Sequence, residues 1–480
     1  MTTATPTATP TASPDAPPST CDLLIVGAGP AGLAAALAAA PSGARIVLLD
    51  DNPAPGGQIW RDGPGVTLPP AARQQRDALE RHAHVQLRCG TRVVGLAEQT
   101  ARSAGLHALW LEDAQGGWVQ HARQIILCTG ARELLLPFPG WTLPGVTGAG
   151  GLQALIKGGL PVAGQRIVVA GSGPLLLAAA HTARQAGAQV VAVAEQAPWT
   201  ALARFGASLA RWPGKAVQAA ALLPAVYRAG SHVVRAHGAH GAHSPHGAVQ
   251  SVTLRQGGQE REIACDRLAC GFGLVPNTEL GQMLGGRVGE RQGLAVDADQ
   301  RLLRGGAAHG PGEPHPADAV PGLLAAGECT GFGGSERSRA EGAIAGHIAV
   351  GDIAAARALH AERARWHAFA DALHRHFALQ PALRRLAEPD TLVCRCEDVR
   401  YADLAERSGW IDAKLHTRCG MGACQGRICG AATHHLLGWT PAPPRHLLAP
   451  VRIGTLAAVA DVADVAASSS RADEAPRHTG

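Results

Sequence analysis

Apolar and polar positions along this chain predict two copies of a strand–turn–helix–strand unit. The first copy starts with the apolar run 23–26, which is too short for a buried helix and is typical of a strand covered on both faces. A glycine-rich turn at 27–32, an Ala/Leu-rich helical segment at 33–40 and a second apolar run at 46–49 follow, and Asp50 ends that run. This order predicts an α/β fold with a parallel sheet.

The glycines and the acid of the first copy have the spacing of a dinucleotide-binding turn. Gly27 permits the tight turn, Gly29 lets backbone approach a pyrophosphate, and Gly32 lets the helix pack closely on the strand. The helix N-terminus presents free N–H groups to the phosphates. Asp50 follows Gly32 by eighteen residues and is placed to accept from a ribose hydroxyl. The flanking strands and helix carry this prediction, because a chain with 60 glycines contains such a pattern by chance.

The second copy covers residues 166–195 and has the same order of elements, with Gly171 and Gly173 in the turn and Glu195 after the second strand. Leu176 stands where glycine or alanine normally permits tight helix–strand packing. Glu195 favours a ribose without a 2′-phosphate. The pattern therefore predicts a second nucleotide-binding fold whose ligand is NAD or another adenine nucleotide, with a vestigial or regulatory site as the alternative.

Composition narrows the class of protein. The 480 residues have room for two or three domains, and 46% hydrophobic with 17% charged residues is typical of a soluble globular chain. The net charge of +5 is not gathered into a long basic run, which argues against nucleic acid as a partner. No apolar run reaches the roughly 18 residues that cross a bilayer, and the Thr/Ala/Pro/Ser-rich residues 1–20 do not have the pattern of a signal peptide. We expect a cytoplasmic protein, at most peripheral at the inner face of the membrane, with thiols or metal ligands in place of disulfides.

Three later segments resemble the FAD-binding half of the two-dinucleotide-domain flavoprotein family. Residues 55–58 (Pro-Gly-Gly-Gln) follow the acid as that family's Gly-Gly turn does, residues 124–133 resemble the strand that returns to the FAD domain, and residues 322–331 resemble its closing motif with Glu328 in place of aspartate. The resemblance implies bound FAD and a helix at 340–349 whose N-terminus faces the flavin. It places these residues at FAD: Gly27, Gly29, Gly32, Asp50, Gly57, Gln58, Thr129, Gly130, Gly327 and Glu328.

Two groups of residues in the middle of the chain give weaker evidence about function. Members of this fold that reduce disulfides have a close cysteine pair beside the flavin, whereas Cys89, Cys128, Cys265, Cys270 and Cys329 are separated and are expected to be buried structural thiols. The histidines of 237–246 lie in Gly/Pro-rich sequence with no fixed geometry, so we favour a solvated hairpin loop over a metal site.

The C-terminal part contains a dense group of cysteines. Five of the eleven fall within residues 394–429 on glycine-rich sequence, as Cys394, Cys396, Cys419, Cys424 and Cys429. Four thiolates suit a [2Fe–2S] cluster; zinc and unliganded thiols are the alternatives. The segment resembles the bacterioferritin-associated-ferredoxin-like (BFD-like) [2Fe–2S] module, although its last two cysteines have four residues between them instead of two. The resemblance implies Cys394, Cys396, Cys424 and Cys429 as ligands, with Cys419 as a substitute.

Taken over residues 22–460, the chain resembles the large subunit of multi-subunit amine dehydrogenases, such as opine oxidase, D-hydroxyproline dehydrogenase and hydrogen cyanide synthase, and the core of the large sarcosine oxidase subunit. The resemblance implies an electron-transferring FAD/[2Fe–2S] subunit that works with an amino-acid-oxidase-type flavoprotein, with or without a small [2Fe–2S] subunit, and passes electrons to a quinone or, in vitro, to a dye. A proline, opine or glycine derivative would be the substrate, and no catalytic residue is identified in this chain. A stand-alone NADH:acceptor reductase and a nucleotide-binding scaffold are the alternatives.

The predicted organisation is two Rossmann-like domains plus a small helical module. Its boundaries are a disordered tail at 1–20, an FAD-binding domain at 21–160 and 265–352, a second nucleotide-binding domain at 161–264, a helical connector at 353–389, a BFD-like domain at 390–460 and a tail at 461–480.

Overall fold

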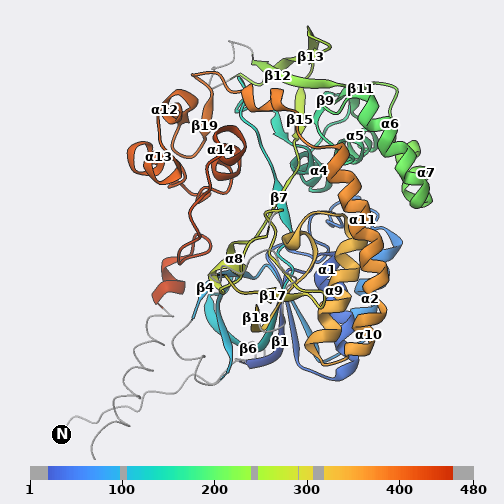
Figure 1. Cartoon of the computed structure of the whole chain (residues 1–480), viewed down its shortest axis with the longest axis vertical. Coiled ribbons are helices and arrows are strands. Elements are labelled where there is room, and N and C mark those ends of the chain that lie inside the picture. The colour runs from blue at the N-terminus through green and yellow to red at the C-terminus, as the bar shows by residue number, and fades with distance from the viewer. Residues whose placement is uncertain (1–19, 98–104, 239–246, 290, 306–317, 458–480) are drawn as a thin grey trace, which may run out of the picture.

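A computed structural model describes residues 20–97, 105–238, 247–289, 291–305 and 318–457. Figure 1 shows two α/β units above one another, with a small helical module beside the upper unit. Residues 1–19 and 461–480 of the predicted tails and residues 239–246 of the histidine tract lie outside the described residues, whereas Thr20 is the first residue of a strand. His237 itself is on a strand, with its Nε2 2.8 Å from the Thr253 hydroxyl.

The lower unit is built on an eight-stranded sheet, in which the central strands are parallel. The strand order is β17-β18-β6-β1-β2-β3, and β5 pairs with β6 and β4. Strands β5 and β6 pair antiparallel as a hairpin. The strands are β1 (Thr20–Val26), β2 (Ile46–Asp50), β3 (Val85–Cys89), β4 (Arg92–Leu96), β5 (His107–Glu112), β6 (Gly117–Leu127), β17 (Arg301–Leu303) and β18 (Ala319–Ala325).

Helices α1 (Pro30–Ala39), α2 (Pro70–Glu80) and α9 (Ser335–Ala349) cover one side of this sheet. Small residues let α1 and α9 approach closely. A Cβ on Gly342 would lie 2.1 Å from the Ala31 carbonyl oxygen, and one on Gly346 would lie 2.3 Å from the Ala35 carbonyl oxygen. Alanine and glycine thus replace large side chains as the means of packing in a chain with 4% aromatic residues.

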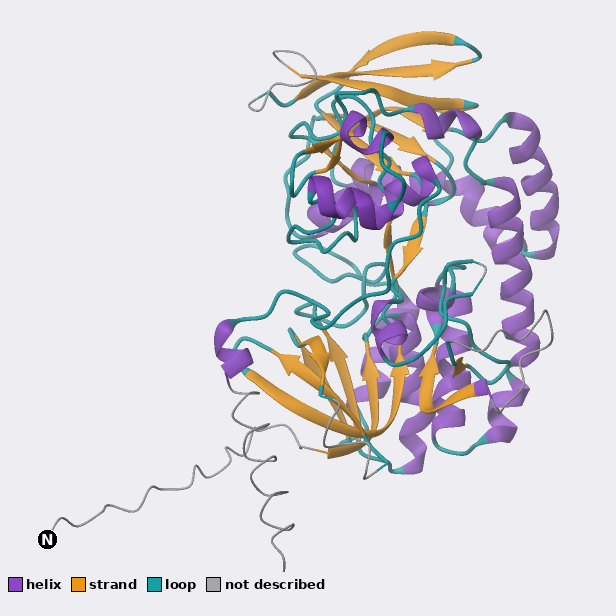
Figure 2. Cartoon of the chain, turned by 60° about the vertical axis from the view of Figure 1, so that its left-hand side comes forward, coloured by secondary structure: helices purple, strands orange, loops and turns teal. Residues whose placement is uncertain are grey.

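The upper unit contains a five-stranded parallel sheet of order β11-β10-β9-β15-β8 and a three-stranded antiparallel sheet, β12-β13-β14. Two short strands, β7 and β16, pair antiparallel and connect the units (Figure 2). The elements of the upper unit and its connection are β7 (Ala131–Glu133), β8 (Val146–Gly148), α4 (Ala149–Lys157), β9 (Arg166–Gly171), α5 (Leu175–Gln185), β10 (Gln189–Glu195), α6 (Trp199–Ser208), α7 (Pro213–Leu222), β11 (Tyr227–Ala229), β12 (Ser231–Gly238), β13 (Val249–Gln256), β14 (Gln259–Ala264), β15 (Arg267–Gly271) and β16 (Leu274–Pro276). Helix α8 (Glu279–Met283) follows β16 and packs in the lower unit.

The boundary between the units differs from the predicted one. Residues 146–160 and 265–273 are predicted from sequence to belong to the FAD domain, but β8 and β15 pair within the upper sheet, where β15 lies beside β9. The chain returns to the lower unit only after β16. A buried parallel strand has the same apolar run in either sheet, so periodicity alone cannot assign it.

The connector and the module complete the described chain. Helix α10 (Ile353–Ala358) packs on the lower unit, helix α11 (His360–His376) runs along one side of both units, and a 3₁₀ helix follows at Pro381–Arg385. The module contains β19 (Leu392–Cys394), β20 (Val399–Arg400), α12 (Tyr401–Ala405), α13 (Trp410–Thr417) and α14 (Cys429–Leu437). After α14 the chain returns to the lower unit, where the Leu448 amide donates to the Val94 carbonyl oxygen over 2.8 Å.

Among the described helices, none combines the length and apolar character that crossing a membrane requires.

Candidate functional site

The first glycine turn lies where β1 meets α1. Gly27 has φ +105°, and a Cβ there would lie 2.3 Å from the Cys128 carbonyl oxygen. A Cβ on Gly32 would lie 1.8 Å from the Gly27 carbonyl oxygen, so the predicted close packing of helix on strand is present. Gly29 is the N-cap of α1, and the nearest atom to a Cβ on it is 3.9 Å away, on Gly57. Gly29 is only partly buried in the folded chain, so a ligand can reach its backbone.

The Asp50 side chain makes hydrogen bonds that fix this glycine turn. It is 5% exposed, and its Oδ2 accepts a hydrogen bond of 2.7 Å from the Ala28 amide. Its Oδ1 accepts from the amide and the side chain of Asn52. The carboxylate thus holds the glycine turn in place at the carboxyl edge of the sheet, where parallel α/β folds bind ligands.

The Gly-Gly segment after Asp50 packs on this turn. Gly56 donates to the Ala28 carbonyl oxygen over 2.7 Å, and a Cβ on Gly57 would lie 3.1 Å from the Gly29 Cα. Gln58 is exposed, and its Oε1 accepts from Arg61 over 2.8 Å. The structure therefore brings Gly57 to the glycine turn, and Gln58 to the rim beside it.

Thr129 and Gly130 follow β6 at the same edge. The Thr129 hydroxyl donates to the Asn277 carbonyl oxygen over 2.7 Å, and the Asn277 side chain donates back to the Thr129 carbonyl oxygen over 2.9 Å. Gly130 has φ +66°, and a Cβ there would meet nothing within 4 Å. This backbone is thus fixed by Asn277 and is open on its other side.

Gly327 and Glu328 form the start of a short 3₁₀ helix after β18. Glu328 is half-buried. Burial raises the pKa of its carboxyl group, and a hydrogen bond from the Gly334 amide acts in the opposite direction. The Gly327 amide donates over 2.9 Å to Glu341, a fully buried acid that sequence reasoning did not single out. Burial acts to raise the pKa of Glu341, but Arg337 and His367 outweigh it and hold that pKa at about 2. The sequence indicates Glu341 only by placing an acidic residue among the small residues of α9.

The second glycine turn is built in the same way but is closed. Glu195 is fully buried; its Oε2 accepts from the Gly173 amide over 2.7 Å and its Oε1 from the Ala197 amide over 2.9 Å. Burial raises the pKa of Glu195 to about 7. Leu176 is fully buried at the position of the missing third glycine, and its Cδ2 lies 3.2 Å from where a Cβ on Gly271 would be.

The connector covers this second turn. The Ser172 hydroxyl donates to the Phe377 carbonyl oxygen over 2.8 Å. Gln196 donates to the Ala378 carbonyl oxygen over 3.1 Å and accepts from the Gln380 amide over 2.9 Å. The Phe377 ring lies 3.8 Å from where a Cβ on Gly173 would be. Gly171 and Gly173 are buried, unlike Gly27 and Gly29, and residues 377–380 lie against this turn on the side where a pyrophosphate would approach.

The cysteines of the module meet in one group. The sulfur atoms of Cys394, Cys419 and Cys429 lie within 4.8 Å of one another and are buried. Cys424 makes a hydrogen bond to Cys429 and another to Cys396, which is exposed. The structure thus gathers all five predicted cysteines, and it places Cys419 in the buried set, although the sequence favours the other four.

Glycines shape the loop that carries these sulfur atoms. Cβ atoms on Gly420 and Gly426 would lie 2.6 and 3.0 Å from the Trp410 ring, and one on Gly422 would lie 2.3 Å from the Cys396 Cβ. Trp410 is 7% exposed and belongs to the small core of the module. The loop is therefore pressed against α13, which sets the positions of the thiols.

The thiols differ in acidity. Hydrogen bonds from Cys419 and Cys429 lower the pKa of Cys394 to about 2, and a hydrogen bond from Cys429 lowers the pKa of Cys424 to about 5. The pKa of Cys429 is raised, first by its hydrogen bond to Cys394. Two thiolates beside three further thiols make a soft donor set, which fits a thiolate-bound metal centre.

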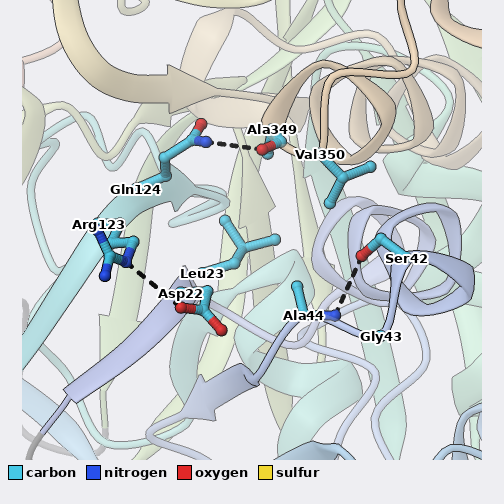
Figure 3. Close-up of a pocket in the computed structure, with 9 residues that line it drawn as sticks. All are labelled: Asp22, Leu23, Ser42, Gly43, Ala44, Arg123, Gln124, Ala349 and Val350. Carbon is cyan, nitrogen blue, oxygen red and sulfur yellow. Dashed lines mark hydrogen bonds and ion pairs between the residues drawn. The ribbon is translucent and has the colours of Figure 1, made fainter.

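A shallow pocket at the opposite end of β1 has no such chemistry (Figure 3). Its polar side chains are paired: Asp22 with Arg123 at 3.5 Å, and Gln124 with the Ala349 carbonyl oxygen at 2.6 Å. It lies at the amino end of the strand, away from both glycine turns.

The fold and the open first turn define a flavoprotein with two dinucleotide-type units, to which a thiol-rich module is attached. The chain belongs to the pyridine nucleotide-disulphide oxidoreductase family, which it matches over residues 21–346, and it is an FAD-dependent oxidoreductase.

Comparison with individual proteins extends the match into the module. The chain is 30% identical to an opine oxidase subunit of Rhizobium meliloti, over 92% of this chain and 99% of that one. It is 31% identical to the HcnB subunit of hydrogen cyanide synthase from Pseudomonas aeruginosa, over 87% and 94%. Among solved structures, L-proline dehydrogenase from P. horikoshii has the same fold, with a TM-score of 0.61, 17% identity and coverage of 91% and 79%.

Proposed function

We propose that this chain is the electron-transferring subunit of a multi-subunit dehydrogenase that oxidises a secondary amine or an amino acid, with FAD at the first glycine turn and a [2Fe–2S] cluster at the cysteine group. The observation that carries the proposal is the gathering of three buried thiols, with Cys424 and Cys396 beside them, in a module attached to an FAD-binding unit. The two relatives named above are each one subunit of an enzyme, an opine oxidase and a hydrogen cyanide synthase, which supports a hetero-oligomer.

The residues present fit both cofactors. Gly29 and Gly130 leave backbone exposed to FAD, and Asp50 stands beside the turn. Bound FAD supplies two-electron chemistry with one-electron release, and an iron–sulfur cluster carries one electron at a time. This chain's own residues position the two groups, whereas a partner flavoprotein of the amino-acid-oxidase type would oxidise the C–N bond. Proline derivatives, opines and glycine are the substrate class we propose.

The rival enzyme, an NADH:acceptor reductase, needs a nucleotide at the second unit. Glu195 favours that interpretation from sequence, but its carboxylate accepts from Gly173 and Ala197, and residues 377–380 cover the turn. We therefore propose that the second unit does not bind NAD(H), and that electrons reach this chain from a partner subunit.

Anaerobic purification followed by assay of flavin, iron and acid-labile sulfide tests the proposal. We expect FAD together with two iron and two sulfide per chain, and zinc in their place would reassign the module. Cys396→Ser should remove the cluster absorbance and leave FAD bound. Cys89→Ser, at a half-buried thiol of the lower unit, is the matched control and should change neither. Flavin without iron and sulfide would overturn the proposal.

Co-purification identifies the assembly. Expression with a second flavoprotein chain from the same source, followed by dye reduction with proline derivatives, opines and glycine, should give activity only when both chains are present. Activity of this chain alone with NADH would favour the reductase.

A further inference from the structure

Arg132 lies between the two places where we propose redox cofactors. It is on β7, three residues after Thr129, and its guanidinium is 23% exposed. Its Nη1 donates to the Asn277 Oδ1 over 2.8 Å and lies 2.9 Å from the Glu279 Oε1. Its Nε donates to the Arg427 carbonyl oxygen over 3.1 Å. One side chain thus touches both the lower unit and the module.

On the FAD side, Arg132 is held by Asn277, which also fixes the backbone of residues 129–130 after β6. Asn277 donates from its amide to the Gly130 carbonyl oxygen over 3.0 Å and from its side chain to the Thr129 carbonyl oxygen over 2.9 Å. The Asn277 Oδ1 is then free to accept from Arg132. A shift of the guanidinium would be transmitted to the backbone of residues 129–130.

On the module side, Arg132 contacts the loop that carries the thiols. Arg427 stands between Cys424 and Cys429, and its amide donates to the Cys424 carbonyl oxygen over 3.0 Å. Burial lowers the pKa of Arg132, and the negative charges of Glu279 and Cys424 act against this change. Arg132 is therefore a partly buried cation bonded to the loop that carries the thiols, where solvent screens its field less than at the surface.

We propose that Arg132 is a positioning residue that raises the reduction potential of the cluster and connects the thiol-carrying loop to residues 129–130 through Asn277. Glu279 offsets part of the Arg132 charge. The inference rests on the proposed function, since it requires a cluster at the cysteine group. Adding an electron makes a thiolate-bound cluster more negative, and a nearby cation favours that state. A carboxylate beside the cation has the opposite effect.

Three variants of the full chain, isolated with both cofactors, test this. The readouts are the iron content and the midpoint potential of the cluster, followed by its electron paramagnetic resonance signal during a redox titration. Arg132→Gln keeps a hydrogen-bond donor and removes the charge, so the potential should fall. Glu279→Gln leaves the Arg132 charge uncompensated, so the potential should rise. Arg132→Lys keeps the charge and should stay nearer to the wild type than Arg132→Gln.

Arg400→Gln is the control, because Arg400 is a 60% exposed arginine of the same module, paired with Asp390 at 3.4 Å. Its removal should leave the potential unchanged. Opposite shifts for Arg132→Gln and Glu279→Gln support the inference, because a purely structural contact would not change sign. Shifts of the same sign, or none at wild-type iron content, overturn the inference and leave the proposed function intact. Absence of iron and sulfide from the wild type overturns both.

Discussion

The two nucleotide-type units share a construction and differ in what lies above it. In each, a buried acid at the end of the second strand accepts a hydrogen bond of 2.7 Å from an amide of the glycine turn, Asp50 from Ala28 and Glu195 from Gly173. Above the first turn the backbone is open at Gly29, and above the second lie residues 377–380. The same motif therefore forms a binding site in one unit and a support for the connector in the other.

The largest effect should come from the first turn. A Cβ on Gly32 would overlap the Gly27 carbonyl oxygen at 1.8 Å, so Gly32→Ala must displace backbone and should cost more than about 3 kcal/mol of stability, with loss of FAD. Thermal unfolding and the flavin-to-protein absorbance ratio measure both changes.

Gly29→Ala is the matched variant, because the nearest protein atom to its Cβ is 3.9 Å away. It should fold normally and bind FAD less tightly, since the new methyl group points to the proposed cofactor. If Gly29→Ala binds FAD as well as the wild type, the pyrophosphate does not lie where we place it.

The equivalent position in the second unit should respond differently. Leu176 on α5 is fully buried against β15, so Leu176→Ala should lower the free energy of unfolding by about 2–5 kcal/mol. The flavin content of the folded protein should not change, because no cofactor contact is lost. Chemical denaturation measures the first and absorbance the second. Half-buried Leu175 is the control, and its change to alanine should cost less.

The buried acid of the second unit should make stability depend on pH. Glu195 has a pKa of about 7 in the folded chain, above the ordinary value of 4.5, because it is buried. Between these values the folded state holds a proton that the unfolded state releases, so the wild type loses stability as pH rises through this range. Relative to Glu195→Gln, the loss should be at most about 3 kcal/mol. Urea denaturation at several pH values checks this, and a difference that is constant with pH would exclude burial as the cause.

The smallest effect should be that of NADH. Because the connector covers the second turn, mixing the purified chain with NADH should leave the flavin absorbance unchanged over seconds. Phe377→Ala with Gln196→Ala removes two of the covering contacts and serves as the companion variant. Rapid bleaching in the wild type would show that the second unit is open to nucleotide.

Sequence was sufficient for the local elements and insufficient for their long-range partners. The site around the first glycine turn could be predicted because its glycines, helix and acid, from Gly27 to Asp50, lie within one strand–helix–strand unit. The five cysteines could be grouped because they are close in sequence. The cover over Gly173 could not be predicted, because it depends on hydrogen bonds between residues about 180–200 positions apart, such as Gln196 with Gln380. Arg132 could not be found for the same reason, since Arg427 is 295 positions away.

The return of the chain to the lower unit after α14 bears on how the protein is made. Glu112 is 2% exposed, and its Oε2 accepts from the Arg452 amide over 2.9 Å and from the Thr455 hydroxyl over 2.7 Å. A nascent chain therefore leaves this carboxylate without those donors until residues 452–455 have left the ribosome. A chain released before residue 452 would keep the hydrogen bond from Arg92 to Glu112 but lack the two from Arg452 and Thr455, so we expect its lower unit to be less stable.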